Sequence, residues 1–133
     1  MIHLTLPWPP SVNNYWTPNV VRGRFIGMRL TPRAKVYRSA SHCAVIAALG
    51  GEPAKILRQV RVDIEMRAPD KRKRDLDNHL KATLDGLTHA GVWADDSQID
   101  ELTVRRGRLI SGGQVIVIVS ELDAELMEWE PEI

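Results

Sequence analysis

Cysteine is almost missing from this chain, and its scarcity limits the kinds of protein that the chain can be. Cys43 is the only cysteine among 133 residues, which excludes an internal disulfide and a cysteine-based zinc cluster. Because Cys43 stands among alanine, valine and isoleucine, we expect it to be a small buried hydrophobe. No apolar run approaches the roughly 18 residues of a membrane span, and the first residues lack a charged-then-apolar signal pattern. We therefore expect a cytoplasmic protein that contacts no membrane.

Basic residues are absent from the end of the chain. Six acids and no Lys or Arg follow Ser120, so residues 1–120 carry a net charge of +7 although the whole chain carries only +1. A basic body suits a polyanionic partner such as nucleic acid. We predict one domain over residues 1–120 and an acidic tail over 121–133. The tail is either a solubilising end or a segment that screens the basic surface until DNA displaces it.

Hydrophobic periodicity predicts an α+β domain. Alternation of apolar and polar residues indicates strands at 2–6 and 60–66, and the continuous apolar run at 115–119 indicates a central strand covered on both faces. Further strands are expected at 24–30 and from 102, with a polar loop at 11–18. Two helices are expected, at 31–50 and at about 75–90, because a Thr-Pro start and glycine stops bound them. We predict a single domain with one mixed or antiparallel sheet packed against two main helices.

The most informative stretch is a run of four cations that leads directly into acids. Lys71, Arg72, Lys73 and Arg74 precede Asp75, Asp77, Asn78 and Lys81, and Asp95 and Asp96 follow downstream. Cations bind the phosphate backbone, and clustered carboxylates bind the hard divalent cations that promote its hydrolysis. Singly, each feature has an ordinary explanation: a helix cap at Asp75, a surface ion pair between Asp77 and Lys81, and a loop at Asp95 and Asp96. Together they favour a nuclease.

Further matches build a resemblance. They comprise Leu6-Pro-Trp-Pro-Pro-Ser11, Asn13-Asn14, Pro69-Asp70, Asp75-Leu-Asp-Asn78, Leu84-Asp85, Leu87-Thr88, Ala90-Gly91, Trp93 and Gly112-Gly113. With this order and spacing the chain resembles the RusA family of Holliday junction resolvases. The resemblance implies an Mg²⁺-dependent endonuclease, with Mn²⁺ as a substitute, that resolves four-way DNA junctions by paired symmetric nicks in DNA recombination and repair. It also implies that Asp75, Asp77 and Asp96 are catalytic metal-binding carboxylates and that Lys81 is an essential catalytic lysine.

Other residues receive supporting roles. We expect Lys71 to Arg74 and Asn78 to bind DNA, and Asp95 to hold Asp96 in position without binding the metal itself. Three aromatic residues near the N-terminal prolines, Trp8, Tyr15 and Trp16, either wedge into the junction centre or pack onto the domain. A homodimer is expected, since a four-way junction has approximate two-fold symmetry and needs two nicks.

The expected helix creates a geometric difficulty for the metal site. From Asp77 to Gly91 it would be about 21 Å long, and the five residues from Gly91 to Asp96 reach at most roughly 17 Å. Either the helix is shorter than expected, or a partner subunit supplies Asp96. Two alternatives to a junction resolvase stay open: a non-catalytic branched-DNA-binding protein, and a metal-dependent nuclease for a flap or RNA.

Overall fold

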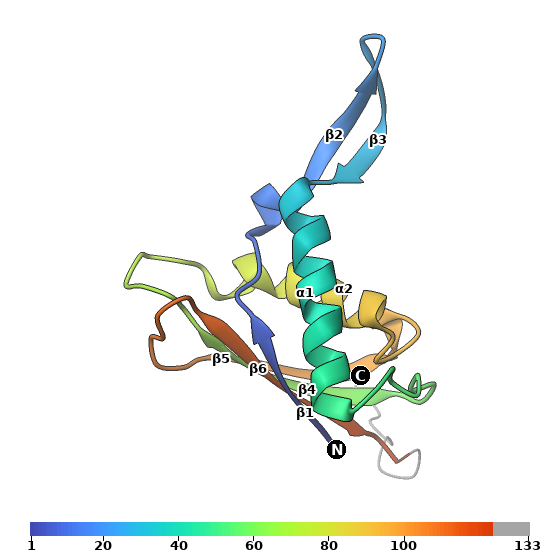
Figure 1. Cartoon of the computed structure of the whole chain (residues 1–133), viewed down its shortest axis with the longest axis vertical. Coiled ribbons are helices and arrows are strands. Elements are labelled where there is room, and N and C mark those ends of the chain that lie inside the picture. Colours follow the sequence, from blue (N-terminus) through green and yellow to red (C-terminus); the bar gives the residue numbers. More distant parts are fainter. Residues whose placement is uncertain (124–133) are drawn as a thin grey trace, which may run out of the picture.

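The computed structural model describes residues 1–123 as six strands, two α-helices and three short 3₁₀ turns. In chain order the elements are β1 (Ile2–Pro7), η1 (Val12–Asn14), β2 (Trp16–Val21), β3 (Arg24–Leu30), α1 (Pro32–Leu49), β4 (Val60–Arg67), η2 (Leu76–His79), α2 (Leu80–Ala90), η3 (Asp96–Gln98), β5 (Ile99–Arg106) and β6 (Gln114–Glu121). Figure 1 shows their arrangement, with β2 and β3 extending away from the rest. Within residues 1–123, no helix is long and apolar enough to cross a membrane.

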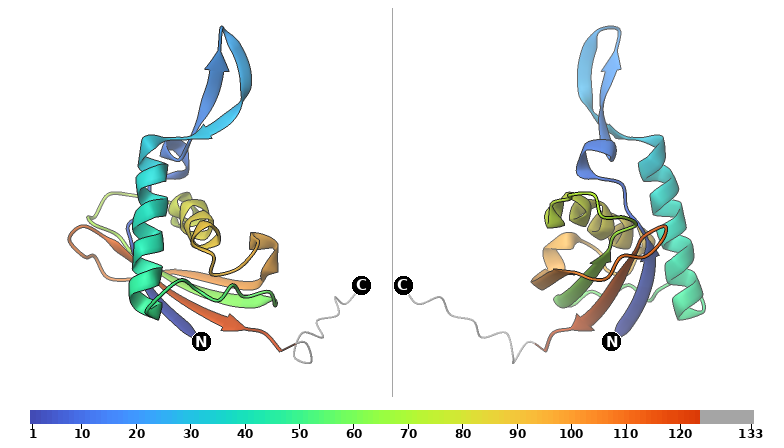
Figure 2. Two further views of the ribbon diagram at one scale, coloured as in Figure 1. Left: turned by 45° about the vertical axis from the view of Figure 1, so that its right-hand side comes forward. Right: turned by 90° about the vertical axis from the view of Figure 1, so that its left-hand side faces the viewer.

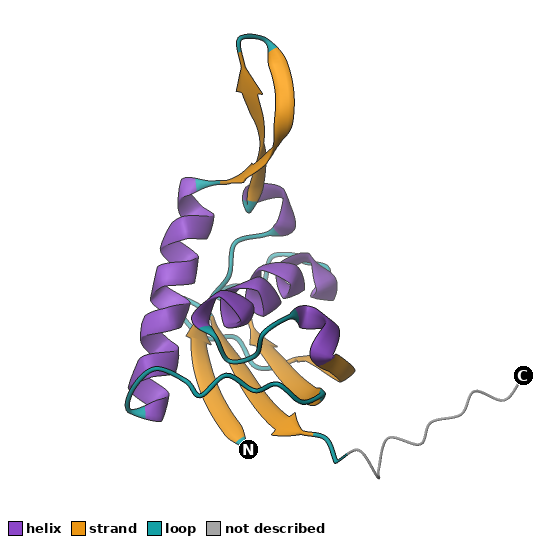
Figure 3. Ribbon diagram, turned by 90° about the vertical axis from the view of Figure 1, so that its right-hand side faces the viewer, coloured by secondary structure: helices purple, strands orange, loops and turns teal. Residues whose placement is uncertain are grey.

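The main sheet has four strands in the order β1-β6-β4-β5. β6 pairs antiparallel with both β1 and β4, while β4 and β5 are parallel and α2 lies in the connection between them. Both helices cover the same face of this sheet (Figures 2 and 3). The predicted α+β domain with a mixed sheet and two main helices is therefore confirmed.

The core lies between this sheet face and the helices. Val60, Val62 and Ile64 of β4 are fully buried, and Val45 of α1 and Leu87 of α2 pack into the same cluster. β6 is a central strand, as expected, but its expected burial on both faces is wrong. Its residues alternate between buried and partly exposed, because the helices cover only one side of the sheet.

Helix α1 begins and ends as the sequence indicates. The Thr31 side chain accepts a hydrogen bond from the Ala34 N–H at 3.1 Å, and Gly50 ends the helix with a φ of 77°. The expected burial of Cys43 is wrong, because its side chain is exposed. The neighbouring residues Ser41 and Val45, four apart, are both buried, and Cys43 falls between them on the opposite side of the helix.

Strands β2 and β3 form a separate two-stranded hairpin. β3 was expected, but β2 replaces the second half of the predicted polar loop. Arg22 and Gly23 join the strands with positive φ values of 52° and 76°, which suit a tight hairpin turn.

At the opposite end of the chain, Glu121 is the last residue of β6. Residues 124–133, most of the predicted acidic tail, lie outside the described residues.

Candidate metal and DNA site

Three predicted catalytic residues lie together where β4 leads into α2. Asp75 precedes η2 in an extended conformation, Asp77 lies within η2, and Lys81 is the second residue of α2. All three side chains are exposed, and none makes a hydrogen bond or ion pair with another residue of 1–123. The Asp75 side chain therefore makes no capping hydrogen bond, and Asp77 and Lys81 form no ion pair with each other. The two carboxylates are available to an external cation.

Asp96 lies at the other end of α2. Its Oδ1 accepts hydrogen bonds from the Thr88 hydroxyl, in the last turn of α2, and from the Trp93 indole N–H at 3.3 Å. The Trp93 N–H also donates to the Thr88 hydroxyl at 2.7 Å, and the Trp93 side chain is fully buried. This arrangement fixes one oxygen of an otherwise exposed carboxylate.

The length of α2 separates Asp96 from the other two carboxylates. α2 is shorter than predicted, with 11 residues from Leu80 to Ala90, but it still spans about 16 Å. An Mg²⁺ ion lies only about 2 Å from each ligand oxygen, so one ion cannot contact both ends. Among residues 1–123 no three His, Cys, Asp or Glu side chains are grouped to hold a metal ion. Within one subunit, Asp75 and Asp77 lie before the start of α2 and Asp96 lies beyond its end.

Asp95 shapes the turn that carries Asp96. Its carboxylate accepts hydrogen bonds from the backbone N–H and hydroxyl of Ser97, which lower its pKa. The Gln98 side chain completes a capping box with the Asp95 N–H at 2.9 Å, and donates at 2.8 Å to the carbonyl of Ile56. Asp95 thus caps the 3₁₀ turn in which Asp96 lies.

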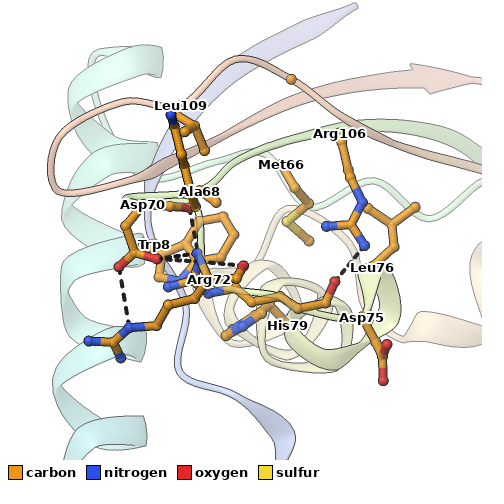
Figure 4. A pocket seen from close by; sticks show the side chains of 13 residues that line it. Trp8, Met66, Ala68, Asp70, Arg72, Asp75, Leu76, His79, Arg106 and Leu109 are labelled. Carbon is orange, nitrogen blue, oxygen red and sulfur yellow. Dashed lines mark hydrogen bonds and ion pairs between the residues drawn. The ribbon is translucent and has the colours of Figure 1, made fainter.

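The four predicted DNA-binding cations fall into two groups. Lys71, Arg72 and Lys73 are exposed, as a backbone-binding role requires. The Arg74 side chain is only 15% exposed and forms an ion pair of 2.8 Å with Asp70, which lowers the Asp70 pKa. Its guanidinium also lies 5.8 Å from the ring centre of Trp8. Arg74 thus belongs to a packed cluster, and Figure 4 shows the Asp75 carboxylate extending away from that cluster.

An open groove of about 860 Å³ runs beside this loop. Its walls include Arg72, Lys73 and Asn78 from the predicted DNA-binding set, together with Arg33 from the start of α1. Arg33 could not be joined to this set from the sequence, because 37 residues separate it from the nearest of the four predicted cations. Cations from two separate segments therefore line one groove.

The N-terminal aromatic residues pack onto the domain. The centres of the Trp8 and His79 rings are 4.8 Å apart. Burial of the His79 imidazole lowers the pKa of His79. Tyr15 is 1% exposed, and Trp16 packs against the same small cluster. Of the two alternatives for these residues, packing is confirmed.

A polar network that the sequence did not reveal joins this region to both helices. The Tyr15 hydroxyl donates to Asp85 of α2, and Arg38 of α1 donates to both oxygens of that carboxylate at 2.8 and 2.9 Å. Burial alone would raise the Asp85 pKa, but the hydrogen bonds from Arg38 and Tyr15 outweigh it and the pKa is lowered. Through these hydrogen bonds Asp85 fixes α1 against α2.

Comparison with known proteins defines the class. A family model described as "Endodeoxyribonuclease RusA" matches residues 7–120, which include every predicted site residue. The chain belongs to this family, and it is an endodeoxyribonuclease by class.

The names of its relatives are more specific than the family description, because they add the crossover junction. The crossover junction endodeoxyribonuclease of Enterobacteria phage 82 is 37% identical, with 92% of this chain and 97% of the relative covered. The RusA protein of Escherichia coli strain K12, also called a crossover junction endodeoxyribonuclease, is 36% identical over 92% and 96% of the two chains. That of Enterobacteria phage HK97 is 34% identical over 90% and 93%.

Proposed function

We propose that this protein is a homodimeric, divalent-metal-dependent nuclease that resolves four-way DNA junctions by paired symmetric nicks. The observation that carries the proposal is the pair of exposed carboxylates of Asp75 and Asp77, which have no partner among residues 1–123 and lie beside a cationic groove. The names of the relatives support the choice of a four-way junction as substrate.

The donor set fits Mg²⁺, with Mn²⁺ as a substitute. Both ions prefer carboxylate oxygens, and neither Asp75 nor Asp77 pairs with a cation among residues 1–123. A bound Mg²⁺ supplies an activated water and stabilises charge on the attacked phosphate. We propose that Asp96 of the partner subunit completes each metal site, because α2 separates Asp96 from the other carboxylates of its own chain.

The remaining residues position the DNA. The exposed ammonium of Lys81, four residues after Asp77, neutralises charge on the scissile phosphate or orients the attacking water. Arg72, Lys73 and Asn78 contact the backbone along the groove, and the exposed Lys71 contacts it from the same loop. These contacts carry little sequence information, so junction selectivity must come from the shape of the DNA.

The test compares wild type with Asp77→Asn on a labelled synthetic four-way junction, a linear duplex, a flap and an RNA duplex. We expect wild type to nick the four-way junction at symmetric positions only with Mg²⁺ or Mn²⁺. Asp77→Asn should bind that junction with unchanged affinity and cut it at least about 100-fold more slowly. Normal cutting by Asp77→Asn refutes the metal site. Binding without cutting by wild type favours the non-catalytic alternative, and preferential cutting of the flap or RNA changes the substrate.

A further inference from the structure

The β2–β3 hairpin exposes large apolar side chains that nothing in the described chain covers. Phe25, the only phenylalanine in the protein, is 65% exposed, and Val20 and Met28 are 56% and 55% exposed. The hairpin projects beyond the helices and the main sheet (Figure 1). Clustered exposed apolar side chains of this kind mark interaction surfaces.

The strand register gathers these side chains on one face. Val20 lies opposite Phe25, and Pro18 lies opposite Met28. Residues directly opposite share a face, and Pro18 and Val20 share one because they are two apart. Phe25 and Met28 are three apart, but the register shift between the pairs adds one residue to β3 at this point. The result is a continuous apolar face toward the tip of the hairpin.

The charge on the hairpin indicates which partner this face takes. Arg22, Arg24 and Arg29 lie on the hairpin, and no Asp or Glu occurs anywhere before Glu52. Pairing two copies of this hairpin would bring six arginines together without a counter-charge. A polyanion with an apolar interior satisfies both features, and DNA with exposed base faces has that chemistry.

The base of the hairpin is fixed against the groove and α2. The Thr31 N–H donates to the Tyr15 carbonyl at 3.0 Å, and the Thr31 hydroxyl donates to the Asn14 carbonyl at 2.6 Å. Tyr15 in turn donates to Asp85 on α2, the helix whose start carries Lys81. Asn14 and Arg33, on either side of the hairpin, line the groove. DNA that follows the groove therefore meets a hairpin held in a defined position.

We propose that the hairpin inserts this apolar face, led by Phe25, between bases at the branch point of the DNA, while its arginines contact the flanking phosphates. The proposal depends on the proposed function for the presence of a branch point. It assigns the selection of branched over linear DNA to the hairpin. A linear duplex offers no unstacked bases, so insertion there must first break base stacking.

The test measures binding without divalent metal, so that no cutting occurs. The probes are a four-way junction and a linear duplex, each with 2-aminopurine either at the branch point (or duplex centre) or within an arm. Phe25→Ser with Met28→Ser should weaken junction binding about tenfold or more and duplex binding less than about twofold, since each base–aromatic stack is worth about that much. Binding of wild type should increase the fluorescence of 2-aminopurine at the branch point. This increase should disappear in the double variant and should be retained in Phe25→Trp.

Leu57→Ser is the matched control, because Leu57 is 77% exposed but lies outside both the hairpin and the groove. It should bind both probes as wild type does. Three results overturn the hairpin proposal: unchanged junction binding by the double variant, equal weakening for both probes, or a change of oligomeric state in sedimentation, which would assign the face to a second copy of the chain. If wild type cuts junctions normally in any of these cases, the proposed function stands. Failure of wild type to cut any junction refutes the proposed function instead.

Discussion

If Asp96 reaches the metal site of the partner subunit, two inactive subunits must form one active site between them. In a heterodimer of Asp77→Asn with Asp96→Asn, one shared site contains both substitutions and the other contains neither. Such a heterodimer should nick at about half the wild-type rate per dimer, and a random mixture of subunits at about a quarter. Each homodimer should be at least about 100-fold slower than wild type.

The structure gives the opposite expectation for a second heterodimer. When one subunit carries both substitutions and its partner is wild type, every shared site loses one carboxylate and nicking should vanish. If each site were complete within one subunit, this heterodimer would keep one active site and the first would have none. The span of about 16 Å along α2 is the reason to expect sharing.

The assay uses doubly tagged, co-purified heterodimers and a supercoiled plasmid that extrudes a cruciform. A dimer with one active site converts the plasmid to a nicked circle, whereas wild type converts it to a linear form by paired nicks. Nicked circles from the doubly substituted heterodimer, with none from the complementing one, would refute the shared site.

Four other variants test the surroundings of the site. Thr88→Val removes the hydroxyl that holds Asp96 and should lower the nicking rate about tenfold, with unchanged junction affinity in a binding titration. Lys73→Gln should weaken DNA binding and flatten its salt dependence by about one unit of slope, whereas Arg74→Gln should instead lower the urea midpoint, because Arg74 is packed against the domain. Arg38→Met leaves a partly buried carboxylate without its cation and should destabilise the fold by about 2 kcal/mol in urea unfolding.

The Arg38 variant also predicts a change in acid stability. The Asp85 pKa is lower in the folded protein, so the unfolded chain binds more protons at acid pH. The stabilisation is complete above the unfolded-state pKa near 4 and is lost as the pH falls through the lower folded value. Urea midpoints between pH 3 and pH 6 should fall less steeply with acid in Arg38→Met than in wild type. Parallel curves would contradict this assignment.

Local patterns predicted much of the fold. The alternation at 60–66 and the Thr31 cap gave the correct element in each case, because both signals act over a few neighbouring residues. β2 was missed because Pro18 removes a backbone donor and usually argues against a strand. A two-stranded hairpin tolerates it, since one edge of each strand has no partner strand within residues 1–123.

In the candidate site too, the sequence predicts what depends on neighbouring residues and misses what depends on distant ones. The run from Lys71 to Lys81 is contiguous, so the sequence could predict that Asp75, Asp77 and Lys81 lie together. It could not predict the burial of Arg74 against Trp8, which depends on residues 66 positions apart. Nor could it place Asp96, whose position depends on contacts with Thr88 and Trp93.

The unequal support of the three carboxylates has a thermodynamic consequence for the proposed dimer. Asp96 is held by Thr88 and Trp93, whereas Asp75 and Asp77 have no partner among residues 1–123. Bringing three carboxylates together across an interface without a cation is repulsive. Binding of a divalent cation and association of the subunits must then strengthen each other, since linkage is reciprocal. Mg²⁺ should therefore lower the dimer dissociation constant in sedimentation, and Asp96→Asn should weaken that dependence while tightening the metal-free dimer.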